Sequence, residues 1–165
     1  MRSTSKLPDD DSTVEATVTI ERPVAEVFAF YRDFRNLPRF LGDVFAVEPI
    51  DSTRSRWTVQ GPLGIRGHWT TTVTEERRDE LIRYEIAGAG SFWEIHFTRG
   101  PRAGSTQVRE VMKIPFGKLG RAALLVIGKR PAEEVAANLR RFKQLMETGR
   151  VTDTTYAVAG KFDGA

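Results

Sequence analysis

The chain contains no cysteine and only two histidines among its 165 residues. Without cysteine there is no disulfide, no thiolate nucleophile and no cysteine-ligated zinc or iron–sulfur centre. Two histidines, His68 and His96, are also too few for a three-histidine zinc site. We therefore expect neither a metal centre nor another cofactor.

Long hydrophobic runs are absent as well. The longest run, from Ala122 to Ile127, has six residues, whereas a membrane-spanning helix needs roughly 20. The first eleven residues hold no apolar stretch of the kind that a secretory signal requires. Together with the lack of cysteine, which suits a reducing compartment, these features predict a soluble cytoplasmic protein.

Charge of one sign is not in large excess, because 25 Lys and Arg residues against 22 Asp and Glu residues leave a net charge of +3. We therefore do not expect the protein to bind nucleic acid. The C-terminal third is the basic part, and it includes Arg140, Arg141 and Lys143 on a predicted helix. This pattern is typical of a solvated helix face, or of weak peripheral contact between that helix and an anionic membrane.

The length fits one domain, flanked by two polar ends. Residues 1–12 lack periodicity and predict a disordered arm, residues 13–149 predict a single domain, and residues 150–165 predict a flexible tail. The sequence leaves the oligomeric state open.

Hydrophobic periodicity predicts the elements of this domain. Residues 14–21 alternate as a strand, and about six further alternating runs, separated by short turns, lie between residues 44 and 114. Helical spacing follows Pro23, recurs at residues 36–41 and 118–128, and continues longest from Pro131 to about Thr148. We therefore predict an α+β fold in which a curved antiparallel sheet of about seven strands wraps around the long C-terminal helix, with two short helices after the first strand.

Three segments carry a resemblance to a known family: IERPVAEVF at 20–28, DFRNLPRF at 33–40 and LRRFKQLME at 139–147. With the element order, they resemble the START-like superfamily, which is the helix-grip fold of polyketide cyclase/dehydrase and lipid-transfer proteins. The match is greatest to its bacterial cyclase-like or coenzyme-Q-binding branch and covers residues 14–148. The resemblance implies a cavity between sheet and helix that holds a hydrophobic small molecule, but it does not fix an activity.

Inward-facing residues of the predicted sheet and helix are the candidates for contacting that ligand. Three tryptophans on one face favour a lined void, while a fully packed core is the alternative. The candidates are Trp57, Trp69, Tyr84, Trp93, Ile95, Phe97, Val108, Glu110, Met112, Asn138, Leu139 and Phe142.

Glu110 is the one ionisable carboxylate on an inward register, and it is the best candidate for a catalytic residue. With Tyr84 and Asn138 it would form the polar end of the pocket and orient a carbonyl or hydroxyl of the ligand. A register shift of one residue would instead place Glu110 in solvent. Glu94 and His96 also share a face, but alternation predicts that this is the outer, solvated one.

Three functions remain open from the sequence. The first is binding or carriage of a polyketide, quinone or lipid without catalysis. The second is a polyketide cyclase or dehydratase that uses the same cavity, in which shaping the substrate can supply much of the rate. The third is a protein-interaction module with a filled core.

Overall fold

The structure, a computed structural model, describes residues 13–116, 119–120, 123 and 129–164. The predicted arm over residues 1–12 and most of the predicted helix over residues 118–128 lie outside this part. The strands are β1 (Thr13–Ile20), β2 (Val44–Pro49), β3 (Arg54–Gln60), β4 (Arg66–Arg77), β5 (Leu81–Ile86), β6 (Phe92–Arg99) and β7 (Thr106–Lys113). The helices are α1 (Val24–Arg32), α3 (Pro131–Thr148) and two short 3-10 helices, η1 (Phe34–Arg39) and η2 (Pro62–Gly64).

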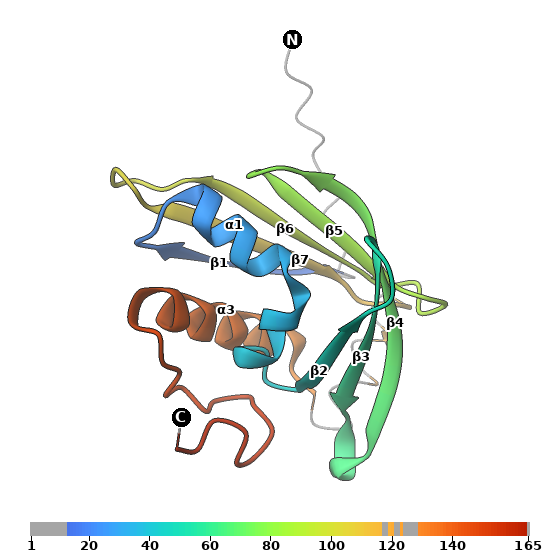
Figure 1. The fold of residues 1–165 in the computed structure, drawn as a ribbon. Helices are drawn as coiled ribbons and strands as arrows, with labels where there is room; N and C mark the ends of the chain where they lie inside the picture. The colour runs from blue at the N-terminus through green and yellow to red at the C-terminus, as the bar shows by residue number, and fades with distance from the viewer. Residues whose placement is uncertain (1–12, 117–118, 121–122, 124–128, 165) are drawn as a thin grey trace.

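All seven strands form one antiparallel sheet in the order β1-β7-β6-β5-β4-β3-β2. The sheet curves around α3 and α1, which occupy its concave side (Figure 1). Every neighbouring pair except β1 and β7 is consecutive in the chain, as short hairpin connections dictate. The predicted α+β helix-grip architecture is confirmed.

The long helix begins and ends where the sequence predicts. Pro131 occupies its first turn, where a missing N–H is tolerated, and Glu133 and Glu134 complement the positive end of the helix dipole. Gly149 ends the helix with φ 76°, a left-handed conformation that glycine adopts without steric strain. This helix is the amphipathic element that covers the concave face.

Aromatic side chains fill the half of the concave face that lies beneath α1. Phe28 of α1 meets Phe97 of β6 with ring centroids 5.3 Å apart. Phe40, after η1, stacks on Phe142 of α3 at 4.6 Å, and Tyr31 is fully buried among them. Edge-to-face and offset contacts of this kind pack wide rings without gaps, so this half of the face is solid.

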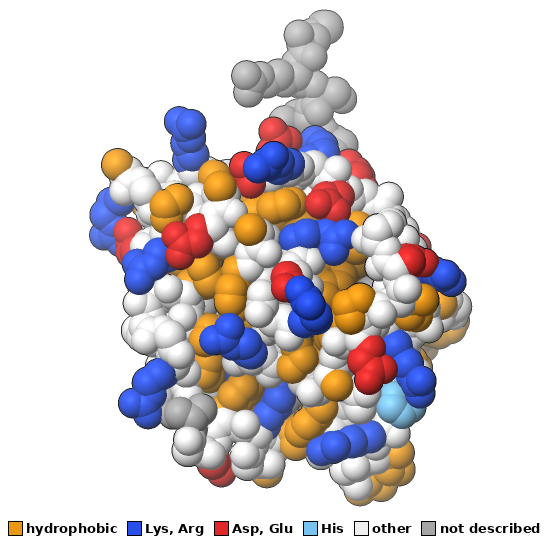
Figure 2. All heavy atoms as spheres, viewed as in Figure 1, with side chains coloured by type: hydrophobic (Ala, Val, Ile, Leu, Met, Phe, Trp, Pro, Cys, Tyr) orange, Lys and Arg blue, Asp and Glu red, His pale blue; other side chains and the backbone are white. Residues whose placement is uncertain are grey.

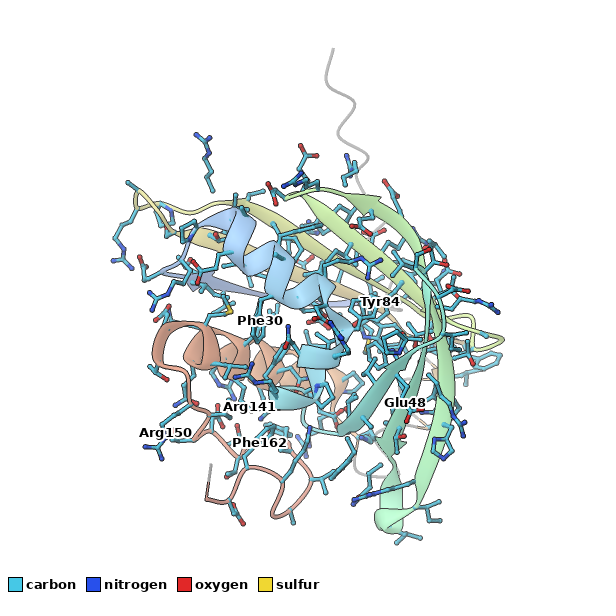
Figure 3. The ribbon with its side chains drawn as sticks, viewed as in Figure 1. Phe30, Glu48, Tyr84, Arg141, Arg150 and Phe162 are labelled. Carbon is cyan, nitrogen blue, oxygen red and sulfur yellow. The ribbon has the colours of Figure 1, made fainter. Side chains whose placement is uncertain are left out.

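Arg141 of α3 is fully buried and connects three parts of the chain. Its Nε donates to the carbonyl of Phe40 at 2.7 Å, and Nη1 donates to the carbonyl of Thr155 at 2.6 Å. Nη2 donates to Oδ1 of Asn138 at 2.6 Å, while the guanidinium lies 5.1 Å from the centre of the Phe162 ring (Figure 3). Burial lowers the pKa of Arg141.

Residues 150–164 pack against the domain, whereas the sequence predicts a flexible tail. Val151 and Phe162 are buried, and the N–H of Val158 donates to the carbonyl of Gly42 at 2.9 Å. Nζ of Lys161 donates to the carbonyl of Leu41, in the link after η1, and to the carbonyl of Val44, at the start of β2. Sequence periodicity gave no sign of this packing because two isolated apolar residues and two long cations make the contacts.

Gly42 allows this close packing of the tail. A Cβ at this position would lie 2.7 Å from the carbonyl oxygen of Tyr156 and 2.9 Å from Nη2 of Arg141. Both distances are shorter than van der Waals contact, so any side chain here would push the tail away from the domain.

The basic residues of α3 have partners within the protein. Arg140 pairs with Asp153 at 3.1 Å, Lys143 pairs with Glu147 at 2.7 Å, and Arg141 is buried. The peripheral membrane contact expected of this helix therefore has no unpaired cation on α3 to support it. Within the described residues, no helix is long and apolar enough to cross a membrane.

Replacing Arg141 with Met should lower the free energy of unfolding by about 2 to 4 kcal/mol, because one buried and two part-buried oxygens lose their donor. Arg140→Met is the matched control one residue away, and it should change stability by less than about 1 kcal/mol because its ion pair is exposed. Urea unfolding measures both values. Equal losses would contradict the connecting role of Arg141.

Candidate functional site

A cavity of about 560 Å³ lies between the central strands and the N-terminal half of α3. Its walls come from β3 to β7, from the link between η1 and β2, and from the residues after β7. The size and the mainly apolar lining are typical of a small-molecule site. The packed-core alternative therefore holds for only part of the concave face.

Seven of the twelve candidate residues line this cavity: Trp57, Trp69, Tyr84, Trp93, Glu110, Met112 and Asn138. Trp57 is buried on β3, and its Nε1 donates to Oγ of Ser55 at 2.8 Å. Tyr84 and Trp93, which both line the cavity, stack with ring centroids 5.5 Å apart and an angle of 6° between the rings.

Five candidates do not line the cavity: Ile95, Phe97, Val108, Leu139 and Phe142. They face inward, as alternation and the helical stripe predict, but they lie in the solid half of the core. The reason is that α1 and η1 fill the space above them with aromatic rings. Alternation identifies the face of a strand, whereas the cavity occupies only part of that face.

Trp69 lines the cavity but remains 47% exposed, although the sequence places it inside. It stands opposite Trp57 in the register of β3 and β4, near the hairpin that joins these strands. The sheet extends past the core at this end, so Trp69 forms part of the rim of the cavity.

Glu110 faces the cavity from β7, paired with Ile95 of β6 and Ala16 of β1. The register shift that would place it in solvent does not occur. Glu110 is 3% exposed. Its carboxyl group forms no hydrogen bond or ion pair with another described residue. Burial raises the pKa of this carboxyl to about 8, so it is mainly neutral at pH 7.

Two tyrosines accompany Glu110. The hydroxyls of Tyr31 and Tyr84 lie 3.3 Å apart, and Tyr84 points into the space between sheet and helices (Figure 3). Burial first, and then neighbouring groups that include Glu110, raise the pKa of both phenols well above 10. The two tyrosines therefore keep their protons throughout the neutral range.

Thr71 on β4 also contributes a polar atom to the cavity. It is 1% exposed, and its Oγ1 has no hydrogen-bond partner among the residues that the structure describes. Our reading of the sequence missed it, although its register with Trp69 and Val73 placed a hydroxyl on an apolar face. An unpaired buried hydroxyl is costly, which makes it a candidate contact for a ligand.

Asn138 serves the fold more than the pocket. Its Oδ1 accepts hydrogen bonds from the N–H of Gly42 at 2.9 Å and from Arg141 at 2.6 Å. The side-chain oxygen of Asn138 is thus engaged within the protein, although the residue does line the cavity, as predicted for the polar end of the pocket.

Charged residues gather on the α3 side of the cavity, and their grouping is not predicted by any sequence pattern. Nζ of Lys129 lies 3.6 Å from Oε2 of Glu134 and 3.9 Å from Oδ2 of Asp43. Burial is the largest cause of a raised pKa at Glu134. Asp43 is far from the other two in the chain, so only the fold brings the three together.

The histidines belong to the outer face of the sheet. His96 lies 3.1 Å from Glu94, which also pairs with Arg83 at 3.0 Å, and His68 contacts the hydroxyl of Thr58. None of these residues lines the cavity. Within the described part of the chain, no three acidic or histidine side chains are grouped to hold a metal ion.

Glu110 should make stability depend on pH. Its folded pKa of about 8 exceeds the usual glutamate value of 4.5, so unfolding releases a proton between these pH values. The free energy of unfolding should therefore fall as pH rises from about 5 to 8, by on the order of 1 kcal/mol per pH unit. Urea unfolding across this range should show that Glu110→Gln flattens the slope. Glu75→Gln, at an exposed position, should leave the slope as it is.

Comparison with solved structures places the fold among bacterial proteins. The chain is similar to DR_A0006 from Deinococcus radiodurans, with a TM-score of 0.63 and 27% identity over 83% of this chain and 98% of that chain. It is also similar to TTHA0849 from Thermus thermophilus, with a TM-score of 0.60 and 22% identity over 81% and 96%. A START superfamily protein from Mycobacterium smegmatis matches with a TM-score of 0.59 and 16% identity over 81% and 98%.

No curated protein matches the chain. Residues 11–147 match the family described as polyketide cyclase / dehydrase and lipid transport. That description indicates hydrophobic ligands, in agreement with the cavity, and the structural likeness to a START superfamily protein supports the same grouping. The resemblance seen in the sequence is thus confirmed, and the chain belongs to the polyketide cyclase / dehydrase and lipid transport family.

Proposed function

We propose that this protein binds and carries a hydrophobic small molecule, such as a polyketide, a quinone or a lipid, in the cavity between its sheet and α3. The observation that carries this proposal is the cavity itself, which has a volume of about 560 Å³ and mainly apolar walls. Protein interiors are otherwise packed about as closely as organic crystals, so a mainly apolar concave space of this size is a feature typical of a ligand site. A protein-interaction module would have no use for it.

The aromatic side chains that line the cavity favour a ligand with planar rings. Trp57, Tyr84 and Trp93 all border it, and Tyr84 and Trp93 stack on each other. A planar ring of a quinone or an aromatic polyketide can make further ring contacts of this kind, whereas a flexible acyl chain cannot.

Polar atoms in the cavity favour a ligand that also carries an oxygen acceptor. The neutral carboxyl of Glu110 and the hydroxyl of Thr71 are both donors without a partner among the described residues. A ligand carbonyl would accept from either donor and remove the penalty for burying it. The other titratable groups around the cavity are Tyr84, Lys113, Asp43, Lys129 and Glu134.

A cyclase or dehydratase is the second candidate, and Glu110 is the reason. A buried acid whose pKa is about 8 holds its proton at neutral pH and could donate it to a reacting carbonyl. The carrier is preferred because the groups on the α3 side, Lys129, Glu134 and Asp43, pair with each other. No nucleophile paired with a base faces the cavity within the described residues.

Filling the cavity should abolish ligand binding. Ile86 lines the cavity, so Ile86→Trp should reduce binding of a hydrophobic fluorescent dye at least about tenfold by occupying its space. Glu85→Trp is the matched control, because the neighbouring side chain points to the outer face and is 44% exposed. Native mass spectrometry with organic extraction would identify any molecule that the wild type retains and the Ile86 variant lacks. A variant that binds as well as the wild type would place the ligand elsewhere.

Binding of a neutral naphthoquinone should weaken as Glu110 loses its proton. If only the protonated form binds, the dissociation constant should rise about tenfold from pH 7 to pH 9. Glu110→Gln keeps a donor and should remove this dependence, while Glu134→Gln tests the other carboxyl whose pKa burial raises. Quinone binding that is unchanged or stronger at pH 9 would contradict a hydrogen bond from the neutral Glu110 carboxyl to the ligand.

A further inference from the structure

Large hydrophobic side chains are exposed mainly around the cavity. Of the seven exposed large hydrophobic residues in the described part of the chain, five lie on two segments next to it. They are Leu63, Ile65 and Trp69 between and along β3 and β4, and Phe116 and Leu119 after β7. The segments adjoin the cavity because Val59 and Trp69 line it on one side, and Ile114 and Pro115 line it on the other. We call Leu63, Ile65, Phe116 and Leu119 the rim residues.

Two rim residues also have an unfavourable backbone conformation. Leu63 has φ 61° and is 96% exposed, and Phe116 has φ 63° and is 87% exposed. A left-handed conformation is strained for a bulky side chain, and glycine or asparagine would adopt it more easily. Neither side chain contributes to the core. Core packing therefore does not account for these two strained conformations, and strain of this kind points to a function outside the fold.

The charge around the rim is positive. Arg66 follows Ile65 directly, and Lys113 lines the cavity beside the second segment. Neither has a carboxylate partner among the described residues, whereas Lys129 and Arg130 are paired with acidic side chains. From Lys113 to Arg130 the sequence has five basic residues and no acidic one.

We propose that the rim residues dock the protein onto a lipid bilayer that contains anionic lipids, with the cavity facing the membrane. Apolar side chains that project from separate turns suit a fluid interface, which requires no matching pockets, and the adjacent cations suit anionic headgroups. Figure 2 shows hydrophobic atoms at the lower right edge of the molecule, where Figure 1 places the end of the β3–β4 hairpin. Docking here would let a hydrophobic ligand pass between bilayer and cavity without crossing water. The proposed membrane contact thus lies at the rim residues, whereas the sequence pattern predicted it on α3, whose cations have partners within the protein.

Co-sedimentation with vesicles of phosphatidylcholine, with and without phosphatidylglycerol, tests this proposal. The wild type should bind the anionic vesicles more tightly, and salt should weaken the binding. The double variant Leu63→Gly with Phe116→Gly should bind at least about tenfold more weakly, since each lost side chain removes buried apolar area. Glycine suits both backbone conformations, so the melting temperature of the double variant should not be lower than that of the wild type. Ile50→Ser, at a residue that is 50% exposed between β2 and β3, should bind as the wild type does.

Each outcome is informative. Equal binding by the double variant and the wild type would overturn the rim as the docking surface, and so would a wild type that binds neither kind of vesicle. If the wild type also forms dimers that the double variant cannot form, the rim residues pair two copies of this chain instead. Dye binding in solution should be the same for both proteins, so failure of docking and failure of the proposed cavity function can be told apart.

Discussion

A buried guanidinium that has no carboxylate partner among the described residues is the constraint on which the architecture depends. Arg141 directs all three of its nitrogens to neutral oxygens, one on the chain after η1, one on the tail and one on its own helix. A buried cation is stable in such a place only because hydrogen bonds of this kind replace those it would make with water. The position of residues 41–44, which form one edge of the cavity, is therefore coupled to the packing of the last residues described. Gly42 lies at the centre of this arrangement because it has no side chain to separate the parts.

The concave face of the sheet is divided by packing. Beneath α1 and η1, rings from three elements interlock, and the N-terminal half of α3 instead spans an open space. The same helix thus packs tightly at Leu139 and Phe142 and leaves a cavity at Glu134 and Val135. Because the aromatic cluster fills one end of the concave face, the open space is confined to the other end, next to Glu110 and Thr71.

Period-two alternation and the helical stripe were enough to predict the sheet, the long helix and the inward direction of Glu110, because these follow from local geometry. They were not enough to separate Phe97 and Val108 from Trp93 and Met112, since depth within a core depends on which distant element lies above a residue. Thr71 was visible as a hydroxyl in an apolar register and could have been found. The packing of the tail could not, because its anchors are backbone carbonyls, which every residue possesses.

The position of β1 at the edge of the sheet has a consequence for how the chain folds. Its register joins Thr13 to Lys113, so the first strand to be synthesised must wait for the seventh before it can pair. Such distant contacts slow folding, because a long loop must be closed before they form. Helix α3 packs against β1 as well. We therefore expect the pairing of β1 with β7 and the packing of α3 on the concave face to occur in one late step. Until that step, the cavity lacks the wall that α3 provides, and the backbone of β7 is unpaired along one edge of the sheet.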